Sequence, residues 1–181
     1  HAEWQYEKSL LFSSVVDVMG LVVCRVQPSI PTAFGSLKDQ VGVSLSALYE
    51  KLNGVERGVS AALVQHGASR LEAVVREMSG QLPPLVAGYR TRIIDGNHFG
   101  ATERRLAVLR QSKAGPLPGQ ALVVLDPSLM LATHMIPCED GHTQERALLG
   151  QVRDLVTRKD LWIADRNFCT FDCLAGIAQR Q

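Results

Sequence analysis

The sequence has few cysteines, few aromatic residues and almost no net charge, and these shortages exclude whole classes of protein. Four cysteines in 181 residues are too few for a disulfide-stabilised scaffold. A formal net charge of +1 excludes a strongly basic domain, so any contact with nucleic acid has to rely on local groups of basic residues. No secretory signal pattern precedes the cysteines, which favours the reducing cytoplasm.

Long hydrophobic runs are also scarce. Residues 9–26 form the most apolar stretch, but Asp17 lies near its middle and Arg25 near its end. An acidic residue at the centre of a bilayer costs about 3 kcal/mol on insertion scales. The sequence therefore predicts a helix packed inside the protein and no association with a membrane.

The composition that remains is that of an ordinary globular protein. It is 46% apolar and 20% charged, which suits one large domain or a medium domain with a small companion. The chain begins at His1 rather than at Met and stops at Gln181 within a helical pattern. We therefore expect a piece of a longer protein.

Helical periodicity predicts an all-α N-terminal region over residues 1–82. Within it, residues 34–54 combine a short helix, a break at Gly42, Ser44 as an N-cap and a second helix that ends near Gly54. This outline is typical of a helix-turn-helix, whose second helix can enter the major groove of DNA. Two helices packed in a bundle give the same outline, and both interpretations stay open.

A further helix is predicted near the end of this region. Its apolar residues recur at helical spacing: Val64, Leu71, Val74, Val75 and Met78. The adjacent prolines Pro83 and Pro84 cannot continue a helix, so we place a linker at residues 83–88. Removing residues 1–80 is therefore expected to leave the remainder folded.

The second half of the chain alternates between strand and helix patterns. Apolar, partly β-branched segments bounded by Gly or Pro predict strands, and amphipathic segments predict helices. The order is β-β-β-α-β-α, over residues 89–99, 119–128, 129–138, 143–159, 161–168 and from 171 onward. This order predicts an α/β fold with a mixed sheet, in which the crossover helix returns the fourth strand parallel to the first and beside it.

Two aspartates end the apolar parts of these neighbouring strands, Asp95 on the first and Asp165 on the fourth. Two carboxylates that converge in this way repel each other unless a cation lies between them, and oxygen ligands favour Mg²⁺ or Mn²⁺. Such a cation equips a site for phosphoryl transfer. Each aspartate also has a structural alternative, because Asp95 precedes Gly96 in a common turn dipeptide and Asp165 could cap a turn or pair with Arg166.

Four segments also resemble a known family: RIIDGNHF, TERRLAVLR, PLPGQALVVLDP and WIADRNFCTFDCL, which lie within residues 89–175. They are similar to insertion-sequence DDE transposases of the IS-four type. The resemblance implies an RNase H-like catalytic domain over residues 89–181, with Asp95 and Asp165 as the first and second catalytic aspartates and metal ligands. It also implies Mg²⁺ or Mn²⁺ as cofactor, the bacterial cytoplasm and nucleoid as location, and a homodimer for the full-length protein.

The same resemblance implies DNA transposition as the function. The DNA partners would be the insertion-sequence terminal repeats and the target, cleaved by metal-activated water and then joined through the freed 3′-hydroxyl. The family's third carboxylate is a glutamate in a downstream Tyr-x-x-Arg-x-x-x-Glu segment, and no such segment follows Asp165 here. We therefore expect an incomplete catalytic domain and little activity from this chain alone.

Several residues near the two aspartates are candidates for DNA contacts. Basic side chains need only charge and reach to bind phosphate, and the densest basic run lies between the first two predicted strands. His98 and Arg166 are close in sequence to Asp95 and Asp165. The candidates are His98, Arg104, Arg105, Arg110, Lys113 and Arg166, with an ordinary solvated surface as the alternative.

Two other functions remain open. The chain could be a catalytically inactive, truncated transposase that binds DNA and inhibits transposition, which the missing glutamate favours. It could also be an unrelated metal-dependent nuclease or phosphatase on the same sheet. That alternative needs a third acid from these residues, and Asp126 or Asp172 would have to point toward the pair.

Overall fold

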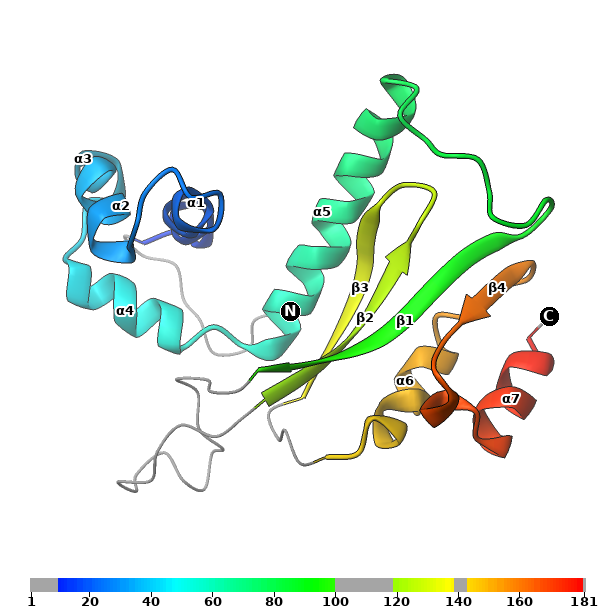
Figure 1. The fold of residues 1–181 in the computed structure, drawn as a ribbon. Coiled ribbons are helices and arrows are strands. Elements are labelled where there is room, and N and C mark those ends of the chain that lie inside the picture. The colour runs from blue at the N-terminus through cyan, green and yellow to red at the C-terminus, as the bar shows by residue number, and fades with distance from the viewer. Residues whose placement is uncertain (1–9, 100–118, 139–142, 181) are drawn as a thin grey trace. The chain divides into compact units, whose positions relative to one another are not determined.

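A computed structural model describes residues 10–99, 119–138 and 143–180 (Figure 1). The chain divides into two compact units, His1–Glu56 and Arg57–Gln181. The division falls earlier than the Pro83–Pro84 segment, at which helix gives way to strand. The two prolines mark the point in the sequence at which helices give way to strands. The helix just before them nevertheless belongs to the second unit, because its contacts are with that unit.

The first unit is built from four helices around one small core. These are α1 (Phe12–Val23), α2 (Ile30–Ser36), α3 (Lys38–Val41) and α4 (Leu45–Asn53). Val18 and Leu48 are completely buried in that core. The apolar stretch at 9–26 is thus a packed helix as predicted, and in the described part of the chain no helix combines the length and apolar character needed to cross a membrane.

The local structure predicted for residues 34–54 is confirmed. Gly42 ends α3 in the left-handed conformation, with φ 65°, which glycine adopts without a steric penalty. Ser44 then caps α4, because its side chain accepts a hydrogen bond of 3.2 Å from the Ala47 amide. The outward surface of α4 includes Tyr49 and Glu50, and its role in reading DNA stays a prediction.

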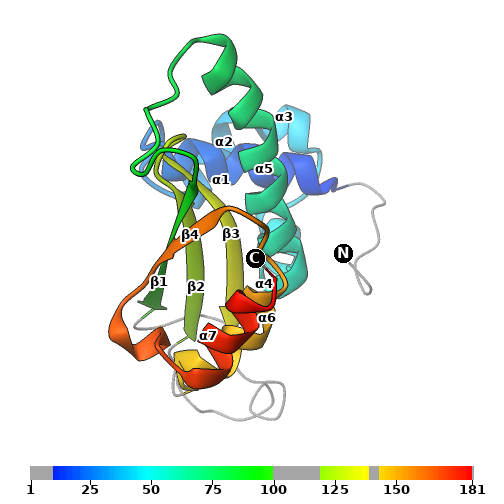
Figure 2. The same cartoon turned by 90° about the vertical axis from the view of Figure 1, so that its right-hand side faces the viewer.

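The second unit contains a four-stranded mixed sheet (Figures 1 and 2). Its strands are β1 (Arg90–Phe99), β2 (Gly119–Asp126), β3 (Leu131–Cys138) and β4 (Asp160–Ile163), in the order β3-β2-β1-β4. The pairs β1–β2 and β2–β3 are antiparallel, and β1–β4 is parallel. The predicted adjacency of the first and fourth strands is confirmed.

Short helices cover one face of this sheet. They are η2 (Glu145–Leu148), α6 (Leu149–Arg153), η3 (Arg166–Phe168) and α7 (Phe171–Ala178). Ile94, Leu122 and Val124 from the strands pack with side chains of these helices in a single core. The helix predicted over 143–159 is shorter than expected, since a 3₁₀ turn opens it and it ends at Arg153. Val156 lies beyond the end of the helix but is still buried, as the spacing of apolar residues in this segment suggested.

Helix α5 (Arg57–Glu77) packs against β3, on the side of the sheet away from α6 and α7 (Figures 1 and 2). The predicted helix is confirmed, but several of the apolar residues that indicated it are exposed. Leu71 and Val74 are about half exposed, at 50% and 47%, and Ala68 is the buried residue of the helix. Small residues allow the helix to approach the strand closely, and hydrophobicity alone did not identify that side.

An ion pair between half-exposed Arg90 and buried Asp160 fixes the register of β1 against β4. Arg90 lies opposite Asp160, and its guanidinium binds the Asp160 carboxylate at 2.7 Å. The amide and hydroxyl of Thr157 donate to the other carboxylate oxygen. Burial raises the pKa of Asp160, but the hydrogen bonds from Arg90 and Thr157 outweigh this effect and hold the pKa below its ordinary value.

We expect a fragment of residues 57–181 to fold and a fragment of residues 81–181 to fail, because the latter lacks the helix that packs on β3. A domain is stable by only about 5–15 kcal/mol, so losing a packed helix of 21 residues is enough to unfold it. Circular dichroism during heating measures both. An equally cooperative transition in the two fragments would contradict this packing, and with it the boundary at Glu56.

Candidate metal site beside strands β1 and β4

Asp95 and Asp165 lie just beyond the paired residues of the parallel strands β1 and β4. Each residue of β1 that pairs with β4 lies 70 positions before its partner in the sequence. The first such pair is Arg90 with Asp160, and the last is Ile93 with Ile163. The two aspartates have the same offset and follow that last pair by two residues. The pairing ends there while β1 continues to Phe99. The register thus brings both acids to the end of the β1–β4 ladder.

Both aspartates are exposed, and each accepts one short hydrogen bond from the local backbone. Asp95 Oδ1 accepts from the Gly96 amide at 2.9 Å, and Asp165 Oδ1 accepts from the Asn167 amide at 2.8 Å. The turn proposed as an alternative for Asp95 is wrong, because Gly96 lies within β1. The cap proposed as an alternative for Asp165 is confirmed, since Asp165 begins η3. One further oxygen of each carboxylate can serve a ligand.

This pair suits a hard cation that also binds substrate. Mg²⁺ is usually held by one or two carboxylates, several waters and the phosphates of its substrate. Within residues 10–99, 119–138 and 143–180, no three His, Cys, Asp or Glu side chains gather in a way that could hold a metal ion. Among these residues, a site that used Asp95 and Asp165 would have two carboxylates and would leave the other coordination positions to waters or to a ligand.

Asp126, one of the acids considered as a third ligand, is engaged elsewhere. It is buried and binds Arg92 at 2.9 Å through one oxygen. Its other oxygen accepts from the amide and hydroxyl of Ser128. Asp172 lies in the first turn of α7. Neither Asp126 nor Asp172 is therefore assigned as a third ligand beside Asp95 and Asp165.

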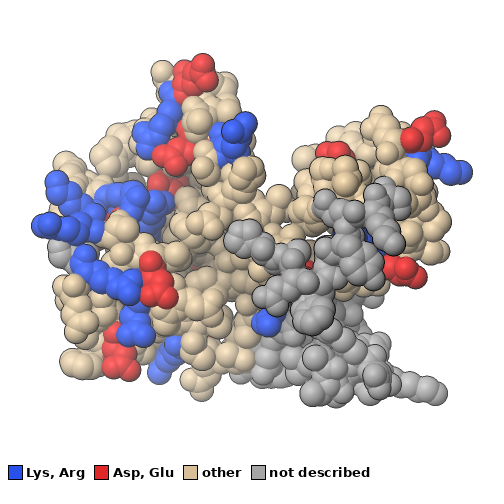
Figure 3. Space-filling view, turned by 180° about the vertical axis from the view of Figure 1, so that it is seen from behind, with Lys and Arg blue, Asp and Glu red and all other residues tan. Residues whose placement is uncertain are grey.

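The proposed DNA-binding residues are placed as follows. His98 lies on β1, exposed, opposite Gln120 of β2. Arg166 is exposed in η3, directly after Asp165. The remaining four lie outside the described residues: Arg104, Arg105, Arg110 and Lys113. Other Lys and Arg side chains gather on one face of the second unit, with Asp and Glu among them (Figure 3), so this face is mixed rather than purely basic.

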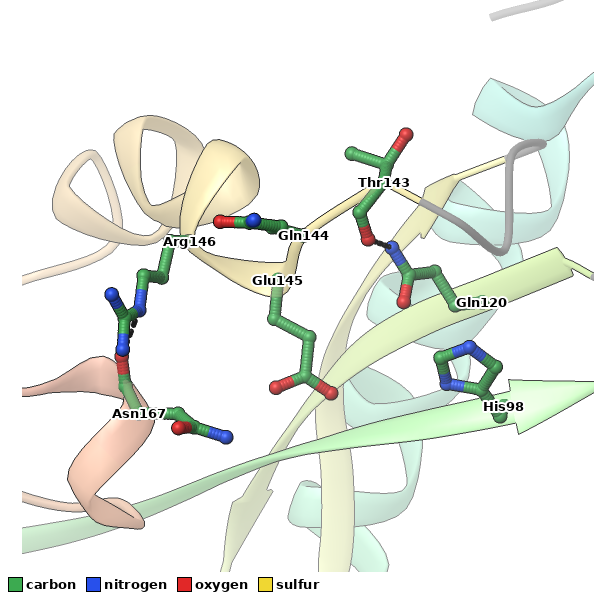
Figure 4. Close-up of a pocket in the computed structure, with 7 residues that line it drawn as sticks. All are labelled: His98, Gln120, Thr143, Gln144, Glu145, Arg146 and Asn167. Carbon is green, nitrogen blue, oxygen red and sulfur yellow. Dashed lines mark hydrogen bonds between the residues drawn. The ribbon is translucent and has the colours of Figure 1, made fainter.

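A pocket of about 610 Å³ lies beside this site, lined by His98, Gln120, residues 143–146 and Asn167 (Figure 4). Strand alternation puts Gly96 and His98 on the core-side face of β1 and Asp95 on the opposite face. The pocket is thus distinct from the aspartate pair. Sequence patterns did not identify Glu145, Gln120 and Asn167, because these residues come together only through the pairing of strands and the crossover connection. Gly96, a glycine inside β1, was a local signal of the pocket.

No family model matches the chain, and neither a curated protein nor a solved structure does. The function is therefore inferred from the arrangement of side chains described above.

Replacing Asp126 with Asn should destabilise the fold by about 3–5 kcal/mol, because it leaves the Arg92 charge buried without a counter-ion. Denaturant unfolding measures the loss, and the response to Mn²⁺ should not change. The double variant Arg92→Met/Asp126→Leu is the control, since an apolar replacement of the whole pair should recover much of the stability. A stable Asp126→Asn variant with weaker Mn²⁺ binding would instead make Asp126 a ligand.

Proposed function

We propose that this chain carries the metal-binding part of a DDE-type DNA transposase, with an incomplete RNase H-like catalytic domain. The observation that carries the proposal is the shared 70-residue offset of Arg90–Asp160 and Asp95–Asp165. Both carboxylates are exposed, and each follows the last paired residue of its strand by two positions. The mixed order β3-β2-β1-β4, with a helical crossover before β4, supports the same proposal.

In this proposal a bound metal ion would supply an activated water or hydroxyl and would stabilise the leaving oxygen of the phosphodiester. Asp95, within β1, and Asp165, at the start of η3, would hold the ion. Arg166 follows Asp165 in η3, within reach of a phosphate on the same DNA strand. His98 lies three residues after Asp95 on β1 and is a second candidate contact.

Cleavage requires a further carboxylate, for which this sequence has no Tyr-x-x-Arg-x-x-x-Glu segment after Asp165. We therefore expect weak cleavage or none from this chain, with insertion-sequence ends and target DNA as its partners and a homodimer for the full-length transposase. We place that protein in the bacterial cytoplasm, at the nucleoid.

A second candidate function is a DNA-binding product that occupies transposon ends without cutting them. The capped helix α4, which follows the Gly42 break, favours this function, because its geometry is that of a second helix in a helix-turn-helix. The exposed Glu50 on α4 works against contact with phosphate. Binding of terminal-repeat DNA without metal would distinguish this function from the first.

We expect millimolar Mn²⁺ to raise the thermal midpoint of the full chain, because a ligand that binds only the folded state stabilises it. Asp95→Asn and Asp165→Asn should each abolish most of this shift. Asn retains the side-chain oxygen that caps η3, so neither substitution should destabilise the fold without metal. The measurement is thermal unfolding of wild type and both variants with and without the ion.

Asp154→Asn is the matched control, since Asp154 is exposed and pairs with Arg180 at a distance of 3.0 Å. It should keep the full Mn²⁺ shift. If both aspartate variants also keep the full shift, Asp95 and Asp165 do not hold the ion and the proposed site is wrong.

A further inference from the structure

The pocket of Figure 4 contains a buried acceptor to which no described residue donates. Gln120 is only 2% exposed, and its amide nitrogen donates to the carbonyl of Thr143. Its carbonyl oxygen is buried and makes no hydrogen bond with the residues that the structure describes. That oxygen is turned toward the side of the pocket where Glu145 and His98 lie (Figure 4). An unpaired buried acceptor costs free energy, so this one calls for a donor from a ligand.

Glu145 provides two more acceptors in the middle of the pocket (Figure 4). Its carboxylate rests against Gly96 so closely that a Cβ atom at this residue would lie 1.8 Å from Oε1. The glycine therefore makes room for the carboxylate. Together, Glu145 and Gln120 present three acceptor oxygens to the same space.

The opposite side of the pocket presents donors. Arg146 gives one of its five N–H groups to the carbonyl of Asn167, at 3.0 Å. The Asn167 side-chain amide lies between Arg146 and Glu145 (Figure 4). The lining thus changes from guanidinium and amide donors at one side to carboxylate and amide acceptors at the other.

We propose that this pocket is a binding site for a guanine base. Guanine has two adjacent donors, N1–H and the N2 amino group, which match the two oxygens of one carboxylate. Its O6 and N7 atoms are acceptors that arginine characteristically binds. The volume of about 610 Å³ is in the ordinary range for small-ligand pockets. The inference goes beyond the proposed transposase function and does not depend on metal.

Other ligand classes fit this lining less well. A phosphate would meet the Glu145 carboxylate at the centre of the pocket, which repels it. A guanidinium or ammonium group would meet the positive charge of Arg146 at the wall. A neutral base with donors on one edge and acceptors on the next can pair with Glu145 and Gln120 on one side of the pocket and with Arg146 on the other. Adenine and inosine lack the N2 amino group, which makes them controls.

Calorimetric titration of the full chain with guanosine tests the proposal. We expect saturable binding, and binding of inosine and adenosine that is weaker by about tenfold or more, the usual effect of losing one good bidentate contact. Glu145→Gln should weaken guanosine binding to a similar extent. Gly96→Ala should do the same, because the new Cβ displaces the Glu145 carboxylate, the far end of a flexible side chain, with the fold preserved.

Glu77→Gln is the matched control, since Glu77 is an exposed carboxylate on α5 outside the pocket. It should bind guanosine like the wild type. The proposal is overturned if wild type shows no saturable binding at millimolar guanosine, or if inosine binds equally well. Unchanged binding by folded Glu145→Gln, or an equal loss in Glu77→Gln, also overturns it.

Two further titrations distinguish the source of the base. Guanosine monophosphate represents a free nucleotide, and a short oligothymidine with one central guanine represents a DNA strand, with plain oligothymidine as its control. Tighter binding of the guanine-containing strand than of guanosine assigns the site to DNA. Tighter binding of the monophosphate alone assigns it to a nucleotide. Neither readout involves metal or cleavage, so failure here leaves the transposase proposal intact, and loss of the Mn²⁺ response leaves this site intact.

Discussion

The ion pair between Arg90 and the buried carboxylate of Asp160 fixes how β4 pairs with β1, and the rest of the candidate site depends on that register. Asp160 is 1% exposed and is held by Arg90 and Thr157 together. A slip of one residue would turn every β4 side chain to the other face of the sheet. It would also separate Asp165 from Asp95. The ion pair is therefore a structural condition for any shared cation at the strand ends.

The sequence predicted the order of elements and the sheet, because strand patterns bounded by Gly and Pro are local and connection rules restrict the topology. It did not predict which helix belongs to which unit. The contact of α5 with β3 depends on small residues such as Ala68, whose signal is weaker than that of exposed Leu71. The crossover helix was also overextended, since its apolar spacing continues to Val156, which packs without being helical.

The adjacency of the two strands that precede Asp95 and Asp165 was predictable from topology, whereas a metal site at these acids stays a prediction. The pocket was not predictable. Glu145 belongs to the crossover, Gln120 to β2 and Asn167 to η3, so their meeting depends on packing rather than on spacing. Asp126 shows the opposite case, a plausible ligand by position that the fold uses to neutralise buried Arg92. A carboxylate gains a chemical role only where its local partners leave an oxygen for a ligand.

The central claim is that one cation contacts Asp95 and Asp165 together. Titration of the ¹⁵N-labelled chain with Mn²⁺ tests it most directly, because the paramagnetic ion broadens the amide signals of nearby residues. The account predicts that Gly96 and Arg166, which follow the two aspartates, broaden together at the lowest metal concentration. Broadening that affects only one of them, or that begins at other carboxylates such as Asp154, would contradict a shared site.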